Sequence, residues 1–158
     1  MEGNMFARFN DMFGDIAKDV AEASVGKVER KVVPFGDYEV KITKLELGEH
    51  KFDDEYKGMP VATIWYKVVS GEYAGQMLFQ NKKLTSIKTP SSNGFIIRKF
   101  MEFLESFESG IPVEFENWQQ FGDLMKTIFN EIDGRAEYQL SYFENKGYKD
   151  YAIVKRFQ

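Results

Sequence analysis

The chain has 158 residues, a length typical of one domain that buries its core without disulfide or metal staples. It has no cysteine and a single histidine, which excludes thiolate nucleophiles, disulfides, zinc–thiolate sites and the usual acyl-transfer triads. No apolar run approaches the roughly 18 residues that span a membrane, and the first residues do not resemble a signal peptide. We therefore expect a soluble, cytoplasmic protein with no membrane partner.

Charge is segregated along the chain, although the net charge of −4 disfavours simple electrostatic capture of a polyanion. The stretch from Gln76 to Met101 contains no acidic residue and five basic ones. The stretch from Glu102 to Glu137 contains nine acidic residues and two basic ones. A basic face on an acidic protein is therefore expected.

The N-terminal segment has apolar residues at helical spacing. Met5, Phe9, Phe13 and Ile16 alternate with charged residues, which predicts an amphipathic helix over residues 4–24. Such a helix either packs on its own domain or forms a homo-oligomer. We treat residues 1–32 as this helix with its linker and residues 33–158 as the main domain.

Three strands are predicted next. The first runs from Tyr38 to Leu47, and a one-residue slip of its apolar alternation between Ile42 and Leu45 predicts a β-bulge. A polar loop over 48–58 leads to a second strand over 59–70, and a turn leads to a third over 76–84. In the second strand one face is uniformly apolar and is expected to point inward: Ala62, Ile64, Tyr66 and Val68.

Two helices and a hairpin complete the pattern. Ser92 or Asn93 can cap a helix, and Asn117 can cap a second helix whose inward stripe begins at Trp118. The inward residues of the first helix are Ile96, Ile97, Phe100, Phe103, Leu104 and Phe107, and those of the second include Phe121, Leu124, Met125, Ile128 and Ile132. Strands over 135–144 and 148–157 flank the turn Asn145-Lys146-Gly147.

Three strands, helices and two strands form the chain order of an oligonucleotide-binding (OB) fold, a five-stranded Greek-key barrel. The fold prediction is therefore a mainly β protein, an OB-fold-like barrel with two helices between strands three and four and an N-terminal helix. In such barrels oligonucleotides and oligosaccharides bind on strands two and three and on two adjoining loops. The prediction of the fold thus becomes a prediction of the site.

Aromatic and cationic residues alternate on the expected binding surface. Aromatic residues make up 16% of the chain, and aromatics interleaved with lysines are typical of single-strand nucleic-acid binding. The predicted nucleic-acid-binding residues are Trp65, Lys67, Phe79, Lys82, Lys83, Lys88, Tyr142, Tyr148, Lys149 and Tyr151. Most aromatic residues of a barrel belong to its core, and Phe79 is compatible with such a place. Trp65 and Tyr148 are the better candidates for exposure.

Catalytic chemistry has little support in the sequence. His50 lies in a polar loop, where a solvated residue is the simpler interpretation. A Mg²⁺-dependent nuclease is a further hypothesis, because carboxylates can bind Mg²⁺ and the loop contains Asp53, Asp54 and Glu55. Three adjacent carboxylates, however, usually form a solvated loop tip. No phosphate-binding glycine motif is present. We expect a protein that is not an enzyme and needs no cofactor.

Two stretches resemble the small single-stranded DNA-binding proteins of phages and prophages of Gram-positive bacteria. They are the launch Val33-Pro-Phe-Gly-Asp-Tyr and the hairpin Gly71-Glu-Tyr-Ala-Gly-Gln, within a resemblance that spans about residues 33–84. The resemblance implies sequence-tolerant binding of single-stranded DNA in replication or recombination, alongside other phage proteins of those processes. The alternative is a phage-encoded protein-interaction module or host-enzyme inhibitor that uses the acidic 102–137 stretch.

Overall fold

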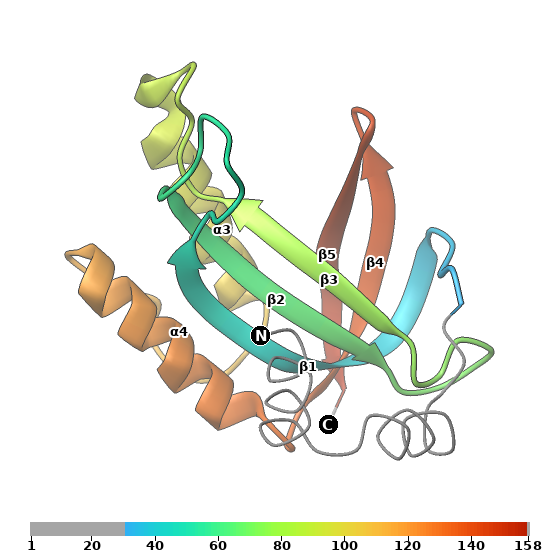
Figure 1. Cartoon of the computed structure of the whole chain (residues 1–158). Coiled ribbons are helices and arrows are strands. Elements are labelled where there is room, and N and C mark those ends of the chain that lie inside the picture. Colours follow the sequence, from blue (N-terminus) through green and yellow to red (C-terminus); the bar gives the residue numbers. More distant parts are fainter. Residues whose placement is uncertain (1–30, 158) are drawn as a thin grey trace, which may run out of the picture. The chain divides into compact units, whose positions relative to one another are not determined.

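The computed structural model describes residues 31–157, shown in Figure 1. The predicted helix over 4–24 and the oligomer contact expected from it lie outside the described residues, as does most of the segment 1–32. The elements are β1 (Gly36–Glu49), β2 (Pro60–Val68), β3 (Met77–Lys83), the 3-10 turn η1 (Pro90–Ser92), α3 (Asn93–Glu105), α4 (Trp118–Ile132), β4 (Glu137–Asn145) and β5 (Tyr148–Phe157). The predicted order of strands and helices is confirmed in this part of the chain.

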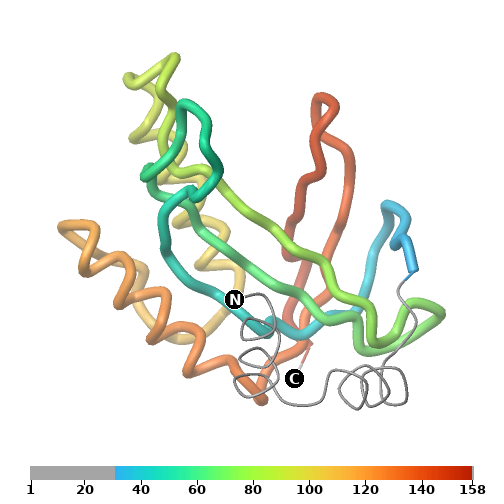
Figure 2. The backbone as a smooth tube through the Cα atoms, in the orientation of Figure 1, coloured from blue at the N-terminus to red at the C-terminus, as the bar shows by residue number. Residues whose placement is uncertain are grey.

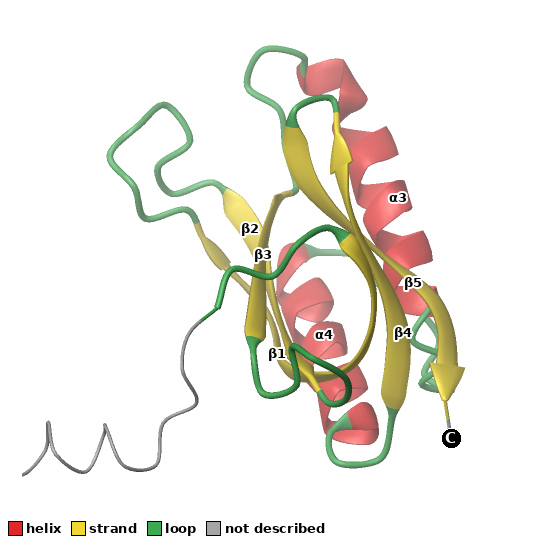
Figure 3. Ribbon diagram, turned by 90° about the vertical axis from the view of Figure 1, so that its right-hand side faces the viewer, coloured by secondary structure: helices red, strands yellow, loops and turns green. Residues whose placement is uncertain are grey.

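The five strands form one antiparallel sheet in the order β3-β2-β1-β4-β5. The protein is thus mainly β with two helices between β3 and β4, as predicted. Within residues 31–157, β3 and β5 are the two edges of the sheet, so backbone pairing does not close it into the expected barrel. Figure 3 shows the curved strands with the two helices behind them.

A bulge bends the long strand β1. The register with β2 shifts between Ile42 and Lys44, which confirms the bulge predicted from the slip in the apolar pattern. The shift lets both Ile42 and Leu45 point into the core, each 3% exposed. The first part of β1 pairs with β4 and the remainder with β2, so one bent strand serves both halves of the sheet.

Strand β2 has one buried face and one partly exposed face, as its alternation predicts. The residues predicted to point inward are all buried: Ala62, Ile64, Tyr66 and Val68. Thr63, Trp65 and Lys67 lie on the opposite face and keep partial exposure. This alternation places Trp65 on the outside of the sheet.

The helices complete the core with the predicted stripes. Phe100 and Leu104 of α3 and five residues of α4 are buried, and the Tyr138 hydroxyl on β4 donates a 2.7 Å hydrogen bond to the Phe107 carbonyl after α3. Asn117 caps α4 by accepting a hydrogen bond from the Gln120 N–H, as predicted. Trp118 is a correction: as the first residue of α4 it is exposed and only stacks against Phe121.

Candidate functional site

The outer face of β1, β2 and β3 presents ordered rows of side chains, because paired residues on neighbouring antiparallel strands point to the same side. The central row combines one cation with two aromatic rings. The pairing sets three rows, Lys41–Lys67–Met77, Lys44–Trp65–Phe79 and Glu46–Thr63–Asn81.

Trp65, which is partly buried, and Phe79, which is exposed, form an outward-facing aromatic pair. Their ring centroids lie 5.2 Å apart in an edge-to-face arrangement, and 43% of Phe79 is exposed. The Lys44 ammonium lies 4.3 Å from the centroid of the Trp65 ring and 3.2 Å from a Glu46 carboxylate oxygen. A cation over an aromatic face contributes about 0.5–1 kcal/mol at an exposed site. The row therefore offers ring surface and positive charge side by side.

A hollow of about 600 Å³ adjoins this row beneath the β1–β2 loop. Its floor includes the polar row, where the Thr63 hydroxyl donates a 3.1 Å hydrogen bond to Asn81 Oδ1. Lys44 and Lys83 line it with positive charge, and His50 and Phe52 of the loop form its wall. The lining of the hollow therefore combines polar, charged and aromatic side chains.

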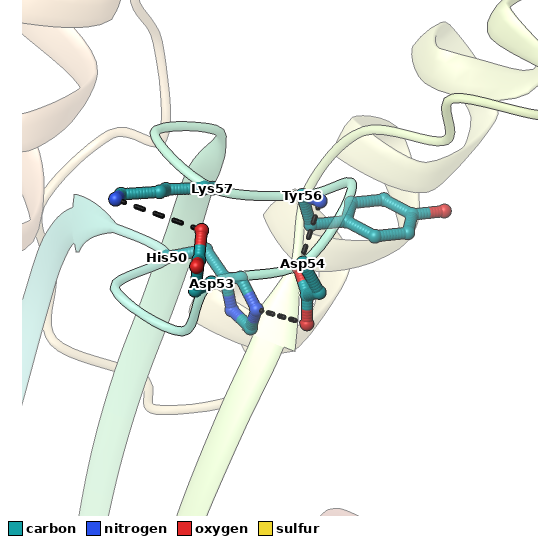
Figure 4. Close-up of polar contacts among 5 residues, drawn as sticks. All are labelled: His50, Asp53, Asp54, Tyr56 and Lys57. Atoms are coloured by element: carbon teal, nitrogen blue, oxygen red, sulfur yellow. Dashed lines mark hydrogen bonds and ion pairs between the residues drawn. The ribbon is translucent and has the colours of Figure 1, made fainter.

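The β1–β2 loop is held in place by its own polar contacts, shown in Figure 4. His50 Nε2 and Asp54 Oδ2 form a 2.9 Å hydrogen bond, and Asp54 Oδ1 accepts a 2.8 Å bond from the Tyr56 N–H. These two bonds lower the pKa of the Asp54 carboxyl, the His50 bond more than the other. Asp53 lies 3.8 Å from the Lys57 ammonium. The two aspartates thus have structural partners within the loop.

This arrangement bears on the nuclease hypothesis for Asp53, Asp54 and Glu55. A metal site needs carboxylates that converge from several elements, whereas these three follow one another in a loop. Among residues 31–157 no group of three or more histidine, aspartate or glutamate side chains gathers at metal-binding distance. The Asp54 carboxylate is instead accounted for by loop structure.

Tyr56 connects this loop to the end of β3. The Lys83 ammonium lies 4.2 Å from the centroid of the Tyr56 ring. Lys83 is therefore positioned by the loop at the point where β3 ends, and its charge stays exposed.

A second hollow, of about 670 Å³, lies between β3 and the β4–β5 hairpin, which stand apart in Figure 2. Its lining residues on β3 are Phe79, Gln80, Asn81, Lys82 and Lys83, and those on the hairpin include Lys146, Tyr148 and Lys149. Tyr148 is 77% exposed. Because Asn81 and Lys83 line both hollows, the two adjoin along the end of β3.

The structure brings together eight of the ten predicted site residues. Three of them, Trp65, Lys67 and Phe79, lie on the outer face of the sheet. The second hollow is lined by the other five: Lys82, Lys83, Tyr148, Lys149 and Tyr151. Lys88 lies apart from them, exposed in the connection between β3 and α3.

Tyr142 and Tyr151 are largely buried, although Tyr151 also contributes to the lining of the second hollow. They are only 5% and 8% exposed, and their rings stack on each other with centroids 5.2 Å apart. Tyr151 also stacks on the buried Tyr66 at 5.5 Å. Lys149 and Tyr151 are two residues apart on β5 and therefore share a face of the strand. Lys149 is exposed near the hairpin tip, whereas Tyr151 is buried further along the strand. Largely buried rings offer little face for stacking, and a role of Tyr142 and Tyr151 in binding stays a prediction.

Among the residues of this surface that were not predicted are Lys44, Tyr56 and Lys146. Lys44 follows from the bulge, since a residue beside Leu45 after the slip must point outward. Lys146 and Gly147 have φ of 51° and 85°, which fits the predicted tight hairpin turn and leaves the lysine at its tip. The position of Tyr56 depends on a long loop and has no signal in the sequence pattern.

No protein-family model matches this sequence, and no curated protein matches it. The function must therefore be argued from the site itself. Among residues 31–157, neither helix is long and apolar enough to cross a membrane.

Proposed function

We propose that this protein binds single-stranded DNA without sequence preference. The observation that carries the proposal is the outward-facing pair Trp65–Phe79, set beside Lys44 and bordered by two hollows with lysines on their walls. This pair makes ring surface available where most aromatic residues of the sheet are used for packing. Its place on β2 and β3 is the place where an oligonucleotide would cross the sheet.

The chemistry of the site fits an unpaired polynucleotide. Every base has a π face, so stacking on Trp65, Phe79 or Tyr148 tolerates any sequence and contributes about 1–3 kcal/mol per base. Bases in a duplex are already stacked and would not reach these rings. Lysines at the end of β3 and on the hairpin can neutralise the phosphates between stacked bases. Binding therefore needs no chemical step and no cofactor.

The strand order supports the same proposal. The order β3-β2-β1-β4-β5 is that of an OB barrel opened between β3 and β5, and the Tyr151 hydroxyl reaches across that gap to the Phe79 carbonyl. In OB barrels oligonucleotides bind on the face of strands two and three and on the loops that join strands one to two and four to five. The two hollows fall on that surface. Since many functions share this fold, the aromatic–lysine site remains the stronger argument.

Net charge is not an obstacle to this proposal, because binding depends on local charge. The acidic residues that line the two hollows are Glu46, Glu49 and Asp150, and lysines outnumber them there. We place the protein in the host cytoplasm, in the replication or recombination of a phage or prophage, together with protein partners of those processes. That setting follows the resemblance of its launch and hairpin motifs.

One observation favours a second function. All nine acidic residues between Glu102 and Glu137 are exposed, which gives the helical part of the molecule a negative surface. A phage-encoded interaction module or host-enzyme inhibitor would use that surface to imitate nucleic acid. Under this alternative, the purified protein would not bind oligonucleotides.

A titration of fluorescently labelled oligo-dT, followed by anisotropy with and without Mg²⁺, separates these functions. We expect saturable binding, an intact oligonucleotide in Mg²⁺, and affinity that falls with added salt. Replacing Trp65 with Ala should weaken binding by about 1–3 kcal/mol, whereas Trp65→Phe should retain most of it. A folded parent that does not bind oligo-dT would reject the proposal, and cleavage in Mg²⁺ would indicate a nuclease.

A further inference from the structure

We propose that the bound strand continues past the end of β3 onto a second patch at the start of α3, which lengthens the footprint beyond the sheet. This patch, here called the α3 patch, consists of Ile87, Lys88, Phe95, Arg98 and Lys99. The inference rests on the proposed function and concerns a surface separate from both hollows.

The α3 patch has the same composition as the sheet site. Phe95 is 65% exposed, and the Lys99 ammonium lies 5.5 Å from the centroid of its ring. Ile87 and the side chains of Lys88 and Arg98 are exposed as well. The patch falls within the Gln76–Met101 stretch, which contains no acidic residue. An exposed ring among three cations complements a polyanion with free π faces.

Packing does not explain these side chains. The buried stripe of α3 is formed by Phe100 and Leu104, and Phe95 lies outside it. Helix stability does not explain them either. Arg98 and Lys99 lie near the middle of α3, beyond the first turn, so the helix dipole gives no reason for cations at these positions. Lys99 forms a 3.5 Å ion pair with Glu102.

The connection between β3 and α3 holds the patch at a defined place. The Ser86 N–H donates a 2.7 Å hydrogen bond to Asn93 Oδ1, and the Thr89 N–H donates a 3.1 Å bond to the Ser86 hydroxyl. Figure 1 shows that this connection leads directly from the end of β3 to the start of α3. The exposed cations and ring that follow Lys82 and Lys83 along the chain lie on this connection and at the start of α3, where the proposed path would run.

The test compares two oligo-dT lengths, roughly 6 and roughly 16 nucleotides, near the two ends of the range that one OB fold covers. In the full chain, Phe95→Ala should weaken binding of the long oligonucleotide about fivefold or more and leave the short one unchanged, while Phe95→Trp should retain tight binding. The double variant Arg98→Ala/Lys99→Ala should lower the salt slope for the long oligonucleotide by about 0.7 for each phosphate that is no longer neutralised. The matched control Lys126→Ala/Arg135→Ala removes two cations elsewhere on the surface. It should leave the affinity for both oligonucleotides unchanged.

Trp65→Ala distinguishes failure of this inference from failure of the proposed function. Suppose that Trp65→Ala weakens binding of both oligonucleotides, while the α3 patch variants bind both with the affinity of the parent. The site on the sheet is then supported and the extended path is rejected. The patch would then serve a protein partner. Equal losses at both lengths in the patch variants would also reject a separate extension. If the folded parent binds neither length, the proposed function fails and this inference fails with it.

Discussion

The hydroxyl of Tyr151 on β5 donates a 3.0 Å hydrogen bond to the carbonyl oxygen of Phe79 on β3. These strands are the two edges of the sheet, so a side chain bridges a gap that no backbone ladder closes within the described residues. The ring of Tyr151 is buried between those of Tyr66 and Tyr142. Phe79, on the other side of the bond, is the exposed member of the outward-facing pair with Trp65. The core and the candidate site are therefore linked at this point.

Replacing Tyr151 with Phe should lower the free energy of unfolding by about 0.5–1.5 kcal/mol, because the ring stays in place and one hydrogen bond is removed. Urea denaturation followed by circular dichroism measures this change. Tyr148→Phe is the matched control, since its side chain is largely exposed and its hydroxyl can bond to water in either state. Equal stability of Tyr151→Phe and the parent would show that the bridge contributes nothing.

Buried tyrosines make the fold sensitive to alkaline pH. Burial raises the pKa of Tyr138 and of Tyr151 to about 12, from an ordinary value of 10.0, and raises that of Tyr66 as well. Because the pKa is higher in the folded state, the stability from these hydroxyls is complete below about pH 10 and is lost as the pH rises toward 12. Urea midpoints at pH 8, 10 and 11.5 should fall only in the upper interval. A constant midpoint across all three would contradict this.

The sequence predicted those features of the fold and the candidate site that depend on a local pattern of residues. The alternation of β2 and the slip in β1 are local, and they correctly placed Trp65 outside and predicted the bulge. The burial of Tyr142 and Tyr151 depends on where the hairpin leaves the sheet, which is a tertiary property. Trp118 fits the helical stripe but occupies the first position of α4, where packing is incomplete. The missing β3–β5 ladder likewise depends on two strands far apart in sequence.

Gly122 is a site for stabilisation, because it lies within α4, where glycine is a poor helix former. An added Cβ would lie 3.7 Å from Leu47 Cδ2, an ordinary van der Waals contact. Gly122→Ala should therefore raise the free energy of unfolding by about 0.5–1 kcal/mol. Thermal and urea unfolding measure the gain, and a destabilised variant would mean that α4 packs too closely on β1 to accept a methyl group.

Lys82 and Lys83 should contribute to binding mainly through charge. A plot of log affinity for oligo-dT against log salt concentration has a negative slope. Replacing both lysines with Ala should reduce the magnitude of that slope by up to about 0.7 for each phosphate left without its lysine. Trp65→Ala should instead lower affinity with little change of that slope, because stacking is not ionic. Anisotropy titrations at several salt concentrations test both. An unchanged slope in the folded lysine double variant would place the phosphate path elsewhere.

Tryptophan fluorescence tests the central claim most directly, since the chain has only two tryptophans and they lie on different elements. The variant Trp118→Phe leaves Trp65 as the reporter on the sheet, and Trp65→Phe leaves Trp118 as the reporter on α4. If bases stack on the Trp65–Phe79 pair, saturating oligo-dT will quench the emission of Trp118→Phe and leave that of Trp65→Phe unchanged. Quenching confined to Trp65→Phe, or binding by anisotropy without any quenching in Trp118→Phe, would contradict the account.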